Sequence, residues 1–252
     1  MISQKELKYY SSLLVKKFRT QENKFLVEGL KIVQEGLSSN FVCETVFATA
    51  EFIESFPELI NKIKGKTPKL VQIKSIEFQK ISDTRAPQGI AAVFKKLVPT
   101  KKISEINDDI IVLLDNIADP GNLGTILRTS DWFGIKNIII TNQSVEYLNP
   151  KVIRASMGSI FHLNIYDDVT EENLNKIKKT GYQIICSDLK GKNIFNFKTN
   201  KKSIITFSNE SSGPSETIKN LSDDFITIPK KGNAESLNVS SAAAIILSKL
   251  TN

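Results

Sequence analysis

The sequence predicts an α/β protein with two domains, the second of them built on a largely parallel sheet. Between residues 106 and 252, short apolar segments alternate with segments whose apolar residues recur at helical spacing. This alternation is typical of parallel strands that are covered by helices on both faces. Residues 95–109 are polar and basic and contain Pro99, which indicates a linker. We therefore expect a smaller α/β domain in residues 1–105 and a larger one in residues 106–252.

The front domain is predicted to mix helices and strands. Apolar residues at helical spacing indicate a helix over residues 4–17, and the apolar residues 25–27 indicate a short strand. A turn cluster at residues 84–89 leads into an apolar strand over residues 90–94. The remaining expected elements are helices over 30–37 and 51–64 and strands over 41–48 and 70–73.

The back domain is predicted to alternate more regularly. Its expected strands are 110–114, 138–141, 161–165, 182–187, 203–207 and 225–228. Its expected helices are 120–133, 150–157, 171–179 and 239–249. In parallel sheets of this kind, ligands bind in the loops that leave the carboxyl ends of the strands. We therefore expect the functional residues in those loops.

Composition and charge narrow the function classes. The formal net charge of +7 favours a polyanionic partner, although a lysine-rich chain can reach this charge without one. No apolar run approaches the roughly 18 residues that span a bilayer. Residues 1–6 have no apolar core and no small-residue cleavage site, so we expect no secretory signal. Cys43 and Cys186 lie far apart in apolar surroundings, so we expect buried free thiols in a reducing compartment. The chain is expected to be cytoplasmic, without a membrane partner and without a metal.

Residues 115–128 are the first segment with the character of a functional site. They follow an apolar strand and open a helix, in which Asp119 suits the N-cap and Pro120 the first helical position. One helical stripe is expected to be buried, and a second stripe of small residues leaves room for an anion beside Arg128. Two glycines in this helix cost about 1 kcal/mol each relative to alanine, which favours function over a simple solvent-facing arginine. The buried stripe is Leu123, Ile126, Leu127 and Ser130, and the small residues are Gly121, Gly124 and Thr125.

Two further segments follow later in the chain. Residues 149–159 contain Arg154 before a glycine, which by itself is weak evidence. More specific are the polar, glycine-bearing loops that follow the strands ending near residues 207 and 228. In the second of these loops Ser236 and Asn238 alternate about Leu237, so an extended backbone would point both polar side chains one way and turn Leu237 inward.

Together, these segments resemble the three motifs of the SpoU (TrmH-type) family of RNA ribose 2′-O-methyltransferases in the SPOUT superfamily. The resemblance covers most of residues 110–250. It rests on Asn122 with Arg128, on Ser208-Asn209-Glu210, and on Glu235-Ser236-Leu237-Asn238-Val239. The front domain resembles, more loosely, the family's substrate-binding domain, which is similar to ribosomal protein L30e. That match rests on Lys16-Lys17-Phe18-Arg19 and Phe25-Leu26-Val27-Glu28-Gly29.

The resemblance implies a deep C-terminal trefoil knot, S-adenosyl-L-methionine as methyl donor, structured RNA as substrate and a homodimer through the knot region. The implied catalytic residues are Asn122, Arg128, Glu210, Ser236 and Asn238. Those implied for the cofactor are Ser208, Asn209, Gly213, Ile228, Gly232, Leu237 and Asn238, and those for RNA are Lys16, Lys17, Arg19, Arg128 and Arg154. The chain departs from the family pattern in having Ser208 where most relatives carry glycine, and Ser211 and Ser212 before Gly213.

The chemistry implied is attack of a ribose hydroxyl on a sulfonium methyl group. The family's usual proposal makes the arginine the base, but a guanidinium has no lone pair to accept a proton. We therefore expect Arg128 to stabilise the developing alkoxide, with Glu210 bracing the site and Ser236 and Asn238 orienting the ligands. His162 is expected to be structural or at the surface, and Trp132 is expected in the core.

The substrate implied is a guanosine of 23S ribosomal RNA, which follows from family frequency and from the front domain. Three alternatives stay open: a tRNA 2′-O-methyltransferase, a noncatalytic RNA-binding member of the fold, and a base methyltransferase acting on guanine N1. Nucleoside identification of the product separates the enzymes from one another. Binding of the methyl donor separates them from the noncatalytic alternative.

Overall fold

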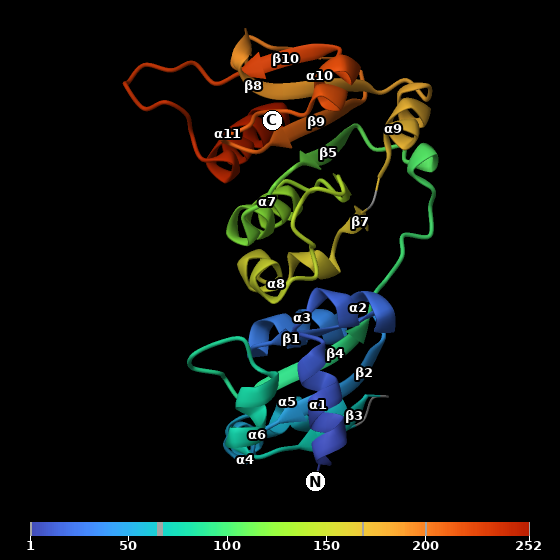
Figure 1. Cartoon of the computed structure of the whole chain (residues 1–252), viewed down its shortest axis with the longest axis vertical. Helices are drawn as coiled ribbons and strands as arrows, with labels where there is room; N and C mark the ends of the chain where they lie inside the picture. The colour runs from blue at the N-terminus through green and yellow to red at the C-terminus, as the bar shows by residue number, and fades with distance from the viewer. Residues whose placement is uncertain (1, 65–67, 168, 200, 252) are drawn as a thin grey trace. The chain divides into compact units, whose positions relative to one another are not determined.

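The computed structural model describes residues 2–64, 68–167, 169–199 and 201–251. The chain folds into two compact units (Figure 1). Unit 1 comprises Met1–Leu97 and Leu148–Phe161, and unit 2 comprises Val98–Tyr147 and His162–Asn252. The predicted division near residue 105 places residues 148–161 in the back domain, whereas in the structure this segment packs within unit 1.

Unit 1 is built on a four-stranded mixed sheet of order β1-β4-β2-β3. Strand β4 pairs antiparallel with both β1 and β2, and β2 pairs parallel with β3. The strands are β1 (Lys24–Glu28), β2 (Cys43–Ala48), β3 (Lys69–Gln72) and β4 (Ile90–Lys95). The helices are α1 (Gln4–Ser12), α2 (Lys16–Glu22), α3 (Leu30–Ser38), α4 (Ala50–Ser55), α5 (Pro57–Lys64), α6 (Ser75–Ile81) and α8 (Pro150–Ser156).

Two helices predicted as continuous are each broken in unit 1. The predicted helix over residues 4–17 ends at Ser12 and resumes as α2 at Lys16. The predicted helix over residues 51–64 is divided before Pro57, which opens α5 because its ring cannot continue the preceding helix but fits a first turn. Helix α6 was not predicted from the sequence.

The core of unit 1 includes a phenylalanine cluster to which the later part of the chain contributes. Phe161 packs edge-on against Phe41 at 5.0 Å between ring centroids and lies 5.1 Å from Phe94. Phe161 was predicted to begin a strand, but it lies in a short 3-10 helix, Ser159–Phe161. A Cβ at Gly36 would lie 2.5 Å from the Phe94 ring and 2.7 Å from the Phe161 ring, so helix α3 can approach this cluster only with glycine there.

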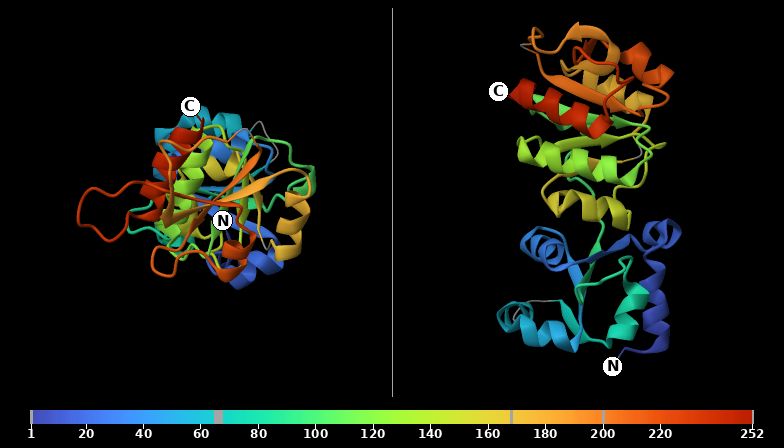
Figure 2. Two further views of the ribbon diagram at one scale, coloured as in Figure 1. Left: turned by 90° about the horizontal axis from the view of Figure 1, so that it is seen from above. Right: turned by 90° about the vertical axis from the view of Figure 1, so that its left-hand side faces the viewer.

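Unit 2 is built on a six-stranded sheet of order β10-β8-β9-β5-β6-β7, in which every pair is parallel. This confirms the predicted parallel sheet. The strands are β5 (Ile110–Asp115), β6 (Asn137–Ile140), β7 (Asn164–Tyr166), β8 (Gln183–Asn193), β9 (Ser203–Ser208) and β10 (Asp224–Thr227). The helices are α7 (Pro120–Trp132), α9 (Glu171–Lys178), α10 (Glu216–Leu221) and α11 (Val239–Thr251), with a 3-10 turn at Ile103–Glu105. Helices α7 and α11 pack together (Figures 1 and 2).

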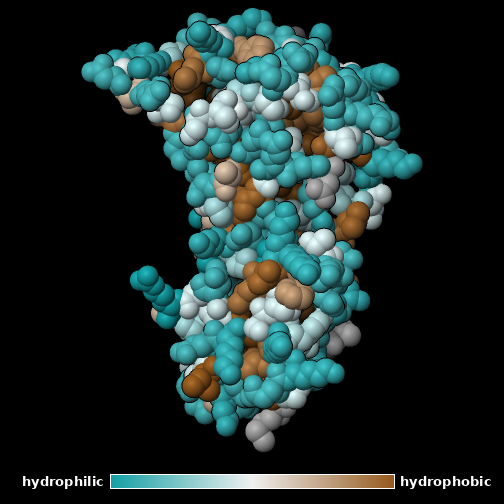
Figure 3. All heavy atoms as spheres, in the orientation of Figure 1, coloured by the Kyte–Doolittle hydropathy of each residue, from teal (hydrophilic) through white to brown (hydrophobic). Residues whose placement is uncertain are grey.

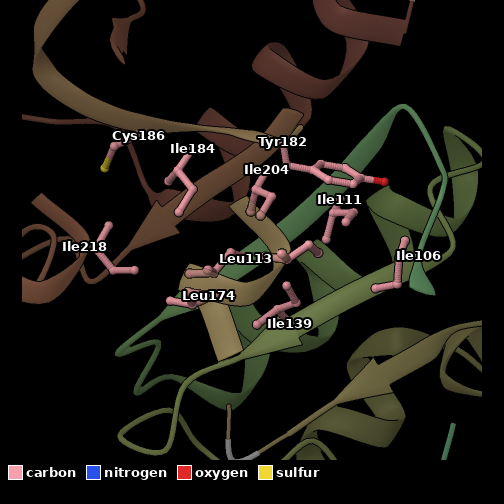
Figure 4. Close-up of a cluster of buried hydrophobic side chains, with 11 residues drawn as sticks. Ile106, Ile111, Leu113, Ile139, Leu174, Tyr182, Ile184, Cys186, Ile204 and Ile218 are labelled. Atoms are coloured by element: carbon pink, nitrogen blue, oxygen red, sulfur yellow. The ribbon is translucent and has the colours of Figure 1, made fainter. Parts of the chain in front are cut away.

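Apolar strand residues fill the core of unit 2, because the sheet is covered on both faces. Ile111, Leu113, Ile184 and Ile204 belong to one buried cluster (Figure 4). Cys186 lies in the same cluster, and burial raises the pKa of its thiol to about 12. Both cysteines are free, as predicted, but only Cys186 is buried; Cys43, also predicted to be buried, is partly exposed.

Polar residues cover most of the face of the molecule shown in Figure 3. Over the described ranges of the chain, no helix combines the length and the apolar composition that crossing a membrane requires.

Candidate active site

Polar loops leave the carboxyl ends of β5, β9 and β10 in unit 2. The loop after β5 leads into α7, where Asp119 is the N-cap and its Oδ1 accepts a hydrogen bond from the Asn122 amide at 2.8 Å. Pro120 occupies the first turn, as predicted. The predicted apolar stripe of α7 is confirmed, since Leu123, Ile126, Leu127 and Ser130 are all buried. This packing fixes the helix that carries Asn122 and Arg128.

Asn122, Glu210 and Asn238 form a hydrogen-bonded triangle, although they lie far apart in the sequence. Asn122 Nδ2 donates to Glu210 Oε1 at 2.8 Å. Asn238 Nδ2 donates to Asn122 Oδ1 at 2.9 Å and to Glu210 Oε1 at 3.2 Å. The structure thus brings together three of the five side chains predicted to be catalytic.

The same triangle is joined to the start of α11. Asn238 Oδ1 accepts hydrogen bonds from the backbone amides of Ser240 and Ser241, which is the bonding pattern of an N-cap residue. Glu210 Oε1 also accepts from the Val239 amide at 3.1 Å. A carboxylate at this end of a helix is stabilised by the helix dipole. Asn238 therefore has two functions, capping α11 and linking its start to Asn122 and Glu210.

The loop after β9 is shaped by Asn209. Asn209 Oδ1 accepts from the amides of Ser211 and Ser212, and Asn209 Nδ2 donates to the Asn116 carbonyl at 3.2 Å. Gly213 closes the loop by donating to the Asn209 carbonyl and adopts a left-handed conformation with φ of 66°. The two serines that distinguish this loop from the family pattern therefore donate backbone hydrogen bonds to Asn209.

A cavity of about 800 Å³ lies beside these loops. Six of the seven residues predicted for the cofactor line it, namely Ser208, Asn209, Gly213, Ile228, Gly232 and Leu237. Asn238 does not line the cavity. It lies instead in the triangle with Glu210, and Glu210 does line the cavity. Ser187, Asp188 and Leu189 form a wall of the cavity that was not predicted, because the expected strand ends at residue 187 whereas β8 continues to Asn193.

Several predicted side-chain environments are wrong. Leu237 was expected to turn inward but is 47% exposed at the cavity wall. Trp132 was expected in the core but is 84% exposed at the end of α7. Arg19 was expected to bind RNA, yet only 4% of it is exposed and its Nη1 donates to the Leu13 carbonyl at 2.9 Å. Arg19 therefore ties α2 to the end of α1.

Of the remaining predicted residues, Ser208 and Ser236 line the cavity, whereas Arg128 is not among the residues that line it. Arg128 and Ser236 are exposed, and neither forms a hydrogen bond or ion pair within the described part of the chain. Ser208 is buried, and its hydroxyl has no hydrogen-bond partner among the described residues. His162 contacts Asp131 Oδ2 at 2.9 Å through Nδ1 and is partly exposed, which agrees with its expected structural or surface role.

Arg154, which was predicted to bind RNA, is part of unit 1. Its Nη2 forms an ion pair with Asp83 at 2.8 Å. Lys16 and Lys17 are exposed on α2 in the same unit. Of the basic residues predicted to bind RNA, these two lysines and Arg128 are exposed and Arg154 is partly exposed.

Comparison with known proteins assigns both parts of the chain. Residues 109–248, more than half of the chain, match the SpoU rRNA Methylase family, and residues 4–92 match the MRM3-like substrate binding domain. The chain is 28% identical over 246 residues to the 23S rRNA (guanosine(2553)-2′-O)-methyltransferase RlmP of Bacillus subtilis, covering 96% of this chain and 94% of that protein.

Solved structures agree with this assignment. A structure from Porphyromonas gingivalis, assigned to the TrmH family of RNA methyltransferases, superposes with a TM-score of 0.86 at 30% identity over 99% of this chain and 98% of that one. The AdoMet-bound rRNA methyltransferase from Sinorhizobium meliloti superposes with a TM-score of 0.87 at 25% identity over 99% and 95% of the two chains. The chain belongs to the SpoU rRNA methylase family.

Proposed function

We propose that this chain transfers a methyl group from S-adenosyl-L-methionine to the ribose 2′-hydroxyl of a guanosine in 23S ribosomal RNA. The observation that carries the proposal is the triangle of Asn122, Glu210 and Asn238, which three separate segments assemble beside the cavity. Family membership supports the reaction. The name of the Bacillus subtilis relative supports the choice of RNA and of base.

The cavity suits the methyl donor in size and in chemistry. Its volume of about 800 Å³ lies within the range of small-molecule sites. Leu189, Ile228 and Leu237 provide apolar walls, and the loop from Asn209 to Gly213 provides backbone groups. These residues would hold the donor, which when bound supplies an electrophilic methyl group.

Arg128 is assigned to the reacting ribose oxygen. It is exposed and has no partner among the described residues, so its charge is available to a ligand. The guanidinium stays protonated and cannot accept the hydroxyl proton. It can stabilise the negative charge that develops on the oxygen as the proton leaves, which lowers the barrier to attack.

Glu210, Asn122 and Asn238 hold the loops in place for this step. Glu210 Oε1 accepts three hydrogen bonds, which join the loop after β9 to both α7 and α11. Ser236, exposed two residues before Asn238, is assigned to orienting the ribose or the donor. In this proposal the site residues align the reactants.

We assign RNA binding to the front domain, residues 1–105, and methyl transfer to residues 106–252. Lys16 and Lys17 on α2 are exposed and carry charges that suit RNA phosphates. The match of residues 4–92 to a substrate-binding domain supports this division, and we take the L30e-like character of the domain as part of the proposal.

A trefoil knot and a homodimer complete the proposal. After β10 at the edge of the sheet, the chain returns to pack α11 against α7 and β9, which is the path that a C-terminal knot requires. Trp132 and Ile245, on α7 and α11, are exposed large apolar side chains that a second copy would cover. We place the enzyme in the cytoplasm, where its free thiols would stay reduced.

The test is methyl transfer from labelled donor to total RNA from a strain that lacks this protein, followed by digestion and nucleoside identification. We expect label in 2′-O-methylguanosine of 23S ribosomal RNA. Label in tRNA would overturn the choice of substrate, and label in a base would overturn the reaction. Absence of both transfer and donor binding, measured by calorimetry, would favour a noncatalytic RNA-binding protein.

A further inference from the structure

The loop of residues 82–88, between α6 and β4 in unit 1, is exposed but firmly held. In Figure 1 it projects from the body of the unit. Glu28, at the end of β1, anchors its first residues. Glu28 Oε2 accepts from the Ser82 hydroxyl at 2.8 Å and from the Asp83 amide at 3.2 Å, and Glu28 Oε1 accepts from the Thr84 hydroxyl at 2.6 Å.

Glu28 is costly to bury, which argues that its position matters. Only 8% of it is exposed, and the three groups that donate to it are neutral. A buried carboxylate without a cationic partner loses hydration that neutral donors only partly replace. No group assigned to methyl transfer contacts Glu28, so what it fixes is the loop itself.

The far end of the loop is held as well. Gln88 Oε1 accepts from the Leu30 amide at 2.8 Å, at the start of α3. Gly89 has a φ of 80°, and a Cβ there would lie 2.7 Å from the Thr49 hydroxyl, so the loop must close with glycine. Asp83 is fixed from the side by its ion pair with Arg154.

Between these anchors the loop presents one free charge. Arg85 is exposed, and its guanidinium has no hydrogen bond or ion pair with any described residue. The loop's own carboxylate, Asp83, is already neutralised by Arg154. The anchors pre-organise the backbone that carries this single unpaired arginine, so little backbone freedom is lost when an anionic ligand binds.

We propose that the loop of residues 82–88 contacts the RNA substrate through Arg85, with Glu28 as the residue that positions it. The inference rests on the proposed function, since it takes RNA as the substrate. The loop contains no aromatic residue on which a base could stack, so the contact assigned to Arg85 is to phosphate oxygens, which its planar fork can bind in pairs.

The first experiment compares Arg85→Ala with Lys62→Ala, a matched loss of charge at an exposed lysine of α5 outside the loop. We expect Arg85→Ala to weaken RNA binding about tenfold, the cost of one charge-assisted hydrogen-bonded contact. The salt dependence of log Kd should become shallower by about one phosphate contact, while kcat and donor affinity stay unchanged. Lys62→Ala should change none of these quantities.

Arg85→Lys should retain part of the affinity and all of the salt dependence, because the charge remains. Equal RNA affinity and salt dependence for Arg85→Ala and Lys62→Ala would overturn the proposal. Loss of affinity in Arg85→Ala with an unchanged salt dependence would overturn the phosphate contact. If the wild-type protein transfers no methyl group to any RNA, the proposed function fails. That failure can be distinguished from failure of the Arg85 contact, because the RNA affinity of each variant is measured directly.

A double-mutant cycle tests the positioning role of Glu28. Glu28→Gln should raise the KM for RNA in the wild-type background and have no further effect in Arg85→Ala, because the arginine that it positions is then absent. Thr84→Val removes the 2.6 Å bond to Glu28 and the 3.2 Å contact between the Thr84 and Ser82 hydroxyls but keeps the carboxylate, and it serves as a milder variant if Glu28→Gln is poorly folded. Additive effects on KM would show that Glu28 acts only on stability and would overturn its assignment.

Discussion

Glu28 in unit 1 and Glu210 in unit 2 both hold loops by accepting three hydrogen bonds from neutral donors, but they do so in different surroundings. Glu28 is buried, and the three groups that donate to it belong to the consecutive residues 82–84. Glu210 is exposed beside the cavity and joins Asn122, Asn238 and Val239, which belong to two different helices or their caps.

Because the two carboxylates differ in burial, their removal should affect different properties of the protein. Removing Glu28 would leave three donors in a partly buried position without their acceptor, which costs folding free energy. Removing Glu210 would leave donors that water can reach, so stability should change little. The hydrogen bonds of Glu210 are worth most when a ligand covers them and excludes water. Glu28 should therefore affect stability and RNA affinity, and Glu210 should affect turnover.

The largest effect is expected for Arg128, on the helix that also carries Asn122. Arg128→Ala should lower kcat by about 10²–10³, the range for a lost transition-state donor, with the unfolding temperature unchanged because the side chain is exposed. Arg128→Lys should recover part of the rate. The measurement is a pH–rate profile of both variants; a new rate-controlling ionisation in Arg128→Lys would contradict electrostatic stabilisation and favour a base.

The next effect is expected for Glu210→Ala, which removes the acceptor for Asn122, Asn238 and Val239. We expect kcat to fall about 10²-fold and the free energy of unfolding to change by less than about 0.5 kcal/mol, as for other exposed positions. Single-turnover methyl transfer and urea denaturation check the two parts. A stability loss as large as that of Glu28→Ala would remove the distinction between the two carboxylates.

Glu28→Ala should show the opposite pattern. It leaves the Ser82 and Thr84 hydroxyls and the Asp83 amide without their acceptor, and we expect a loss of about 1–3 kcal/mol in the free energy of unfolding. The kcat with saturating RNA should stay within about twofold of wild type, since Glu28 contacts no assigned catalytic group. Urea denaturation and steady-state kinetics test this, and a collapse of kcat in a folded variant would place Glu28 in the chemistry.

The smallest effect concerns a buried acid outside both sites. Burial raises the pKa of Cys186 to about 12, whereas an unfolded thiol ionises near about 8.5. Its contribution to stability is therefore complete below about pH 8.5 and is lost as the pH rises toward 12. Between about pH 8.5 and pH 10 we expect the unfolding temperature to fall by about 2–4 °C more in wild type than in Cys186→Ala. Equal declines in the two proteins would contradict this.

The parallel sheet of unit 2 could be predicted from sequence because its central strands are buried on both faces and are almost wholly apolar, as in Ile110–Asp115. Pro57 marks the break between α4 and α5, but the helical spacing of apolar residues on both sides of it predicts one continuous helix. The environments of Arg19, Trp132 and Leu237 could not be predicted, because each depends on neighbours that only the tertiary structure supplies.

The candidate site also contains residues that could be predicted from the sequence and residues that could not. Residues such as Asn122, Glu210 and Asn238 could be named in advance because they match family motifs, and the structure shows that they meet. The capping of α11 by Asn238 follows from an ordinary helix-start preference. In contrast, Leu189 could not be named, because strand β8 continues past an apolar stretch into polar residues that no periodicity marks.

The placement of residues 148–161 has an evolutionary consequence. This segment lies within the part of the chain that matches the methylase family, yet its Phe161 completes the aromatic core of unit 1. The front and back domains are therefore not separable at the linker alone. Recombination between relatives at the linker would combine Phe161 from one protein with Gly36 and Phe94 from another, so we expect these three positions to change together in evolution. A front domain grafted from a relative should likewise need that relative's helix α8 in place of the recipient's.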